Sequence, residues 1–138
     1  MLLASAEQQG IRSDVIPKIA TGFCSGLSRT AGLCGAVSGG VMGIGLALGR
    51  SEPGAPTDPA YSAVRSFLQA FAAWAGAPAD ELTCLRLTGV HLGTPEGQEA
   101  FRAKNQLPRC QEYAAQAVLL ALQAIEAGGI NHDLSQLS

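Results

Sequence analysis

The residues of this chain with the clearest capacity for chemistry are its four cysteines, Cys24, Cys34, Cys84 and Cys110. None of them belongs to a CxxC pair, which excludes a thioredoxin-type motif and a zinc knuckle. A thiolate is both a nucleophile and a metal ligand. If the fold brings these distant cysteines together, they could therefore perform dithiol–disulfide exchange or bind a metal, and their spacing leaves both alternatives open.

Cys34 and Cys110 share a predicted environment. Each is expected in the first turn of a helix, Cys110 directly after the helix start at Pro108. Free N–H groups and a partial positive charge at a helix N-terminus stabilise a thiolate and lower its pKa. The alternative is that both cysteines are small core hydrophobes. Cys24 is expected near the end of a helix, and Cys84 within a short helical stretch.

The length and composition of the chain set the elements that must position these cysteines. The 138 residues fit one domain, so residues 1–138 are expected to form a single helical domain with a loose C-terminal tail over about 128–138. Only 14% of the residues are charged, and a lightly charged surface favours self-association, here as a homodimer. The net charge of −2 and the absence of a basic run exclude nucleic-acid binding through phosphate contacts.

The N-terminal residues bear on the redox environment. The segment 1–11 contains Glu7 and lacks a basic region ahead of an apolar stretch, so no secretory signal is recognised and a cytoplasmic location is expected. Cysteines in a reducing compartment are more often thiols, metal ligands or redox pairs than structural disulfides.

Apolar periodicity, glycine and proline together predict an all-α fold, a helical bundle with about four main helices and several short ones. No segment shows the sustained alternation of a strand. Short connections favour antiparallel neighbours. The expected helices cover residues 1–9, about 13–23, 33–48, 58–77, 80–87, 94–104 and 108–127.

The segment 33–48 is apolar on all sides and rich in glycine. Gly35, Gly39 and Gly43 recur every four residues, so they lie along one face of the helix. Each glycine costs about 1 kcal/mol of helix propensity relative to alanine, and very close approach of a second backbone best explains this cost. The segment is short for a bilayer span, which needs about 20 apolar residues. We therefore expect a buried central helix and no membrane partner.

Two further helices carry apolar faces that predict the core. The first has the spacing of a buried aromatic stripe, and the last has an inner face of mostly small residues. The two faces consist of Val64, Phe67, Leu68, Phe71 and Trp74 in the first helix, and Cys110, Ala114, Ala117, Ala121 and Ile125 in the last.

The run from Cys34 to Gly39 reads CGAVSG, a CGAxxG motif that is followed by Cys84 and then by Cys110. In this respect the chain resembles, over about residues 1–125, the bacterial family of redox-active proteins named for the pattern C-GCAxxG-C-C. The resemblance implies a helical chain with Cys34, Cys84 and Cys110 as site residues. A related domain occurs in a cytochrome that also holds an iron–sulfur cluster, so the resemblance extends to a cluster with thiolate ligands.

One family cysteine, near the N-terminus, has no counterpart in this chain. Cys24 occupies what resembles a glycine position of the family, so it is a stand-in only if it lies close to the other three cysteines. Two expectations follow: either the sequence begins after that cysteine, or this member has lost it.

Three functional hypotheses remain. The first is a redox protein with a redox partner protein, in which Cys34, Cys84 and Cys110 cycle between thiol and disulfide or bind an iron–sulfur cluster. The second is a structural or partner-binding helical module with inert core cysteines. The third is a zinc protein with thiolate ligands. Enzymatic activity is left open.

Overall fold

The computed structural model describes the backbone of residues 1–136 and the side chains of residues 1–129. Within this part of the chain the secondary structure consists of helices and one isolated β-bridge, without a strand, which confirms the all-α class. In chain order the helices are α1 (Leu2–Gln8), α2 (Val15–Ala20), the 3-10 turn η1 (Thr21–Phe23), α3 (Cys24–Arg29), α4 (Gly35–Leu48), α5 (Asp58–Ala75), α6 (Cys84–Thr88), α7 (Pro95–Ala103) and α8 (Leu107–Gln136).

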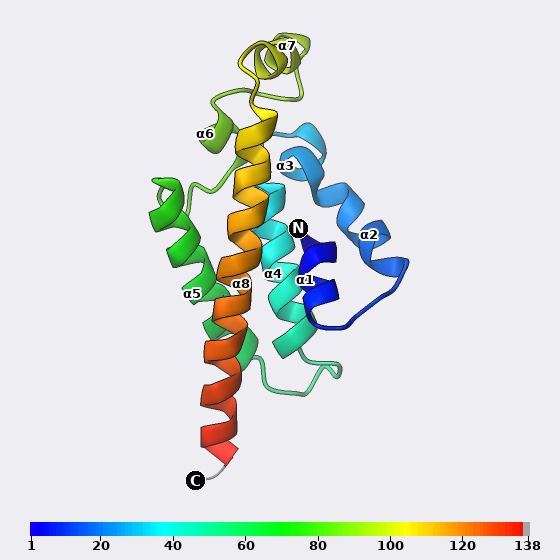
Figure 1. Ribbon diagram of the computed structural model, residues 1–138, viewed down its shortest axis with the longest axis vertical. Helices are drawn as coiled ribbons and strands as arrows, with labels where there is room; N and C mark the ends of the chain where they lie inside the picture. Colours follow the sequence, from blue (N-terminus) through cyan, green and yellow to red (C-terminus); the bar gives the residue numbers. More distant parts are fainter. Residues whose placement is uncertain (137–138) are drawn as a thin grey trace.

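Three long helices, α4, α5 and α8, pack against one another and form the centre of the molecule (Figure 1). Helix α5 runs antiparallel to the other two, as the short connections predict. The sequence predicted about four main helices, but the helix expected to reach residue 23 ends at Ala20. Among its large apolar residues only Ile16 is buried, whereas Val15 is 50% and Ile19 60% exposed, so little tertiary packing supports a longer helix.

The predicted aromatic stripe of α5 lies in the core, with Phe67 and Phe71 fully buried. Trp74, at the end of the stripe, is 39% exposed and meets the Tyr113 ring of α8 edge-on, with 5.8 Å between the ring centroids. The inner face of α8 supplies Ala117 and the other small residues that let α4 and α5 approach it closely.

The glycine face of α4 explains its unusual composition. A Cβ atom on Gly43 would overlap Ser5, and one on Gly39 would lie 3.1 Å from Met1 Cβ, so α1 packs directly on the backbone of α4. On the adjacent face, a Cβ atom on Gly40 would overlap the Phe67 ring. The predicted close approach and the central position of this helix are confirmed. No described helix has both the length and the apolar character that a bilayer span requires.

Helix α8 continues beyond its predicted end. The sequence placed this end at about residue 127, followed by a loose tail, but α8 runs through Gly128 and Gly129 to Gln136. A Cβ atom on Gly128 would lie 2.8 Å from the Leu48 side chain, so tight packing on α4 favours glycine at this point of the helix. Residues 137–138 of the expected tail lie outside the described residues.

Candidate functional site

Cys34, Cys84 and Cys110 lie near the starts of three helices, at the same end of the bundle (Figure 1), whereas Cys24, which was expected near the end of a helix, is the first residue of α3. Cys110 lies in the first turn of α8, as predicted, and Cys84 is the first residue of α6. Cys34 comes one residue before α4, in the capping position and in extended conformation, rather than within the first turn.

A β-bridge fixes two of these cysteines relative to each other. The N–H group of Cys34 donates to the carbonyl of Leu82 at 2.9 Å, and that of Cys84 donates to the carbonyl of Gly32 at 2.7 Å. These two hydrogen bonds flank the single antiparallel pair formed by the residues just before the cysteines. Because side chains alternate along extended backbone, Cys34 and Cys84 lie on the same face of the bridge as diagonal neighbours. No sequence pattern indicates this bridge, because it is too short to show an alternation of side chains.

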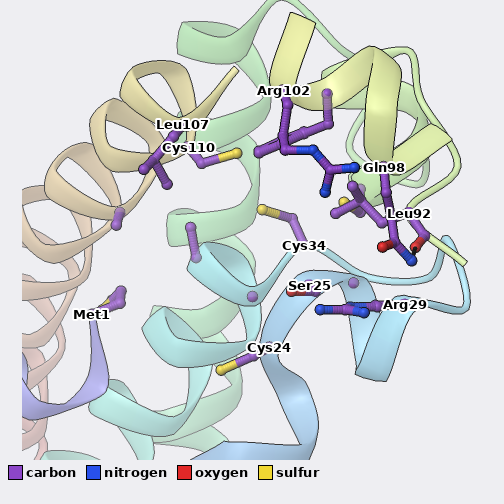
Figure 2. A pocket seen from close by; sticks show the side chains of 16 residues that line it. Met1, Cys24, Ser25, Arg29, Cys34, Leu92, Gln98, Arg102, Leu107 and Cys110 are labelled. Carbon is purple, nitrogen blue, oxygen red and sulfur yellow. Dashed lines mark hydrogen bonds between the residues drawn. The ribbon is translucent and has the colours of Figure 1, made fainter. Parts of the chain in front are cut away.

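A cavity of about 450 Å³ opens at this end of the molecule, and all four cysteines line it. Figure 2 shows that the sulfur atoms of Cys34 and Cys110 point toward each other, whereas the sulfur of Cys24 points away from both. Cys84 is buried, Cys34 and Cys110 are half-buried, and Cys24 is exposed. The fold therefore brings together the three cysteines named by the sequence and leaves the sulfur of Cys24 apart.

The electrostatics of Cys34 differ from the prediction. The backbone N–H groups of Ala36 and Val37, in the first turn of α4, hydrogen bond to its sulfur and lower its pKa, as expected for a helix N-terminus. Burial raises the pKa of the same thiol by more, so the net direction is upward. The predicted net lowering is wrong, because the cavity removes water from the sulfur while the helix supplies only two donors.

The other two thiols respond to the charge on their neighbours. Burial is the main cause that raises the pKa of Cys84, and a thiolate at Cys34 raises it further, against a hydrogen bond from the Thr88 hydroxyl. The pKa of Cys110 is raised first by burial and then by charge on Cys84 and on Cys34. The three sulfur atoms thus form one electrostatic group. Cys34 is the member whose thiolate receives backbone hydrogen bonds.

A left-handed turn borders the group. Residues of α3 have positive φ angles, including 55° at Ser25 and 51° at Leu27. An L-residue in this conformation costs roughly 1–2 kcal/mol. A Cβ atom on Gly26 would overlap the side chain of Cys84, so a glycine here lets the turn lie against the first residue of α6.

The cysteine group does not fit the metal centres that the sequence left open. Within the described residues, no group of three or more His, Cys, Asp or Glu side chains has the arrangement of metal ligands. An iron–sulfur cluster takes four thiolates, and structural zinc takes four ligands. Cys34, Cys84 and Cys110, as they are arranged here, complete neither set of ligands by themselves.

Two arginines that sequence reasoning missed also line the cavity, Arg29 from α3 and Arg102 from α7. They approach it from opposite sides (Figure 2). Nothing in their sequence neighbourhood marks them, because they are scattered charges in separate segments. Only the tertiary fold places them beside the thiols.

Comparison with known families identifies a model that matches most of the chain. The family model described as "Putative redox-active protein (C_GCAxxG_C_C)" matches residues 1–124. No curated protein and no solved structure matched the chain in the corresponding comparisons. The matched range contains Cys34, Cys84, Cys110 and every other residue that lines the cavity. Because the match covers most of its length, the chain belongs to the C_GCAxxG_C_C family.

Proposed function

We propose that this protein is a dithiol–disulfide redox protein in which Cys34 and Cys110 form the reactive pair and Cys84 is the third thiol. The observation that carries the proposal is the convergence of three thiols, from the starts of three helices, on one cavity. Inert core cysteines need no such convergence and no access to a cavity. The family description, which names redox activity, supports the same conclusion.

The environments of the thiols suggest their roles. Cys34 is the attacking nucleophile, because backbone N–H groups stabilise its thiolate and because this charge disfavours ionisation of its neighbours. Cys110 is the resolving thiol, because its sulfur points toward that of Cys34 (Figure 2). Cys84 is only 7% exposed, so a substrate reaches it less readily than it reaches the other two.

The proposed reaction oxidises two protein thiols and reduces one substrate disulfide. The Cys34 thiolate attacks a disulfide, a bond forms between Cys34 and one substrate sulfur, and the other substrate sulfur leaves as a thiolate. Cys110, as a thiolate, then attacks the Cys34 sulfur, forms the Cys34–Cys110 disulfide and releases the second substrate sulfur. Two electrons pass from the protein to the substrate, and the two cysteine protons end on the released thiols.

The raised pKa values set the conditions for this reaction. Burial raises the pKa of Cys34 and Cys110, so both thiols are protonated at neutral pH. The thiolate fraction, and with it the rate of attack, therefore rises at a higher pH than it does for an ordinary cysteine. Reduction of the Cys34–Cys110 disulfide needs an external dithiol. We propose a dithiol redox partner protein, which is oxidised to its own disulfide as it returns two electrons and two protons to the pair.

Equilibration in thiol–disulfide buffers of graded potential tests the proposal. We expect one reversible two-electron transition, and peptide mapping of the oxidised protein without reductant should find Cys34 linked to Cys110. Cys34→Ser and Cys110→Ser should each remove the transition, whereas Cys24→Ser, the matched control at the exposed cysteine, should leave it in place. If the native thiols react only after unfolding, the cysteines are inert core residues and the proposal is wrong.

A further inference from the structure

The charge distribution around the cavity is one-sided. Arg29 and Arg102 line it, and none of its lining residues is Asp or Glu. Neither arginine belongs to an ion pair in the described part of the chain, where the ion pairs involve other cations. This cationic opening belongs to a chain whose net charge is −2, so the rest of the molecule carries the excess of negative charge.

The walls of the cavity are mostly apolar. Leu92, Phe101 and Leu107 contribute carbon surface to its lining. The amide of Gln98 donates to the Leu92 carbonyl at 3.0 Å, which holds this wall in place. A volume of about 450 Å³ lies within the range of small-molecule sites. The cavity therefore suits a molecule with a short carbon body, a sulfur group and an anionic end.

Positive charge at this position also favours the chemistry. Attack on a disulfide creates a negatively charged leaving sulfur, which nearby cations stabilise. Arg29 and Arg102 each present a planar guanidinium that can hold a carboxylate through two parallel hydrogen bonds. The long helices α4 and α8 add the positive ends of their dipoles at the same end of the bundle.

We propose that the cavity binds a small disulfide that carries carboxylate groups, with Arg29 and Arg102 holding the carboxylates while Cys34 attacks the sulfur. This inference rests on the proposed function and names the substrate class of the same site. The reaction is the exchange described above, in which the substrate leaves as two carboxylate-bearing thiols. A small molecule is favoured over a protein disulfide, because the thiols lie buried or half-buried in a cavity of small-molecule size.

Three aliphatic disulfides of different charge test the substrate class: dithiodipropionate, which is anionic, bis-hydroxyethyl disulfide, which is neutral, and cystamine, which is cationic. The second-order rate constant of the reduced protein with each is divided by that of free mercaptoethanol, which corrects for differences in intrinsic reactivity. We expect the corrected rate for dithiodipropionate to exceed that for the neutral disulfide by about tenfold at low salt and to fall as ionic strength rises. Cystamine should react most slowly.

Arg29→Gln and Arg102→Gln test the two residues. Each change should lower the ratio of the anionic to the neutral rate constant by about threefold or more, and the double variant should remove the preference. Arg12→Gln is the matched control, because it removes the same charge from an exposed residue that does not line the cavity. It should leave the ratio unchanged. Circular dichroism should show that every variant remains folded.

The outcomes separate this inference from the proposed function. If the native thiols reduce all three disulfides without a preference for the anionic one, the inference is wrong and the redox function stands. If the preference exists but survives in the double variant, the arginines do not hold the substrate and the inference is also wrong. Faster reduction of an unfolded protein's disulfides would assign the site to a protein substrate and overturn the inference. If no native thiol reacts, the proposed function itself fails.

Discussion

Two regions of the molecule differ in how completely they are packed. One is the glycine seam of α4, defined by Gly39, Gly40 and Gly43, and the other is the cysteine end of the bundle. In the seam, a single added methyl group meets Met1, Phe67 or Ser5. At the cysteine end, the same helix begins beside a cavity of about 450 Å³, next to a left-handed turn. Tight packing in one region thus allows open space and local strain in the other, because the seam stabilises the whole domain.

This difference implies that two parts of α4 have separate roles, one in the stability of the domain and the other in thiol chemistry. Substitutions in the seam should lower stability while leaving the thiols reactive in molecules that remain folded, whereas substitutions at the cysteine end should change thiol chemistry with little loss of stability. Distant sites that share no partners act almost additively. The predictions below test this separation.

The largest expected effect is at Phe67, which is fully buried against Gly40. Phe67→Ala removes a ring from the core and leaves a cavity, so the free energy of unfolding should fall by about 3–5 kcal/mol. Denaturant unfolding followed by circular dichroism measures the change. Tyr61→Ala, on the same helix at a side chain that is 57% exposed, should change stability by less than about 0.5 kcal/mol. Equal effects would mean that Phe67 is not packed in the seam.

Two glycine substitutions within α4 should have smaller effects on stability, and the two effects should have opposite signs. Gly40→Ala places a methyl group against the Phe67 ring and should destabilise the protein by about 1–3 kcal/mol. Gly45→Ala meets nothing within 4 Å and should stabilise the helix by up to about 1 kcal/mol. Thermal unfolding of both variants gives the comparison. Stabilisation by Gly40→Ala would refute the close contact between α4 and α5.

At the cysteine end, the left-handed turn predicts a stabilising substitution. Ser25 is exposed and has a φ of 55°, so Ser25→Gly should relieve strain and raise the free energy of unfolding by about 1 kcal/mol. Ser62→Gly, at an exposed position of the right-handed helix α5, should lower it by about 0.5 kcal/mol. If both variants lose stability alike, the turn at residue 25 is not left-handed.

The most gradual effect is a dependence on pH. Burial raises the pKa of Cys34, Cys84 and Cys110 in the folded protein, so the folded state keeps these protons to a higher pH than the unfolded chain does. The corresponding stability is fully present below the pKa of an unfolded thiol and is lost as the pH rises through the raised values. Urea unfolding between neutral and alkaline pH should show this decline.

Two variants locate the origin of that decline. Cys34→Ala should make it shallower, because one buried thiol no longer has to ionise in the folded state. Ser62→Ala, at an exposed position of α5 without a titratable side chain, should leave it unchanged. An identical alkaline slope in the native protein and in Cys34→Ala would show that burial of this thiol does not contribute.

Much of the fold was predictable, because local patterns carry the necessary information. The stripe of Phe67 and Phe71 gave the core face of α5, and the glycine repeat gave the close approach around α4, since each pattern repeats with the helical period. The end of α8 was not predictable. Gly128 is a local stop signal, and only the tertiary structure shows that α8 continues past it where it packs on Leu48.

The sequence by itself determined which residues could act: three cysteines behind helix starts or in short helical stretches, together with the CGAxxG motif that indicated the family. Only the tertiary structure decided how they act. Through a β-bridge with two backbone hydrogen bonds, it placed Cys34 beside Cys84. Burial in the fold raised the pKa of the thiols, whereas their positions at helix starts predicted a lower pKa. It also placed Arg29 and Arg102 beside them. Desolvation and contacts between distant segments depend on the whole fold, and no local pattern of residues encodes them.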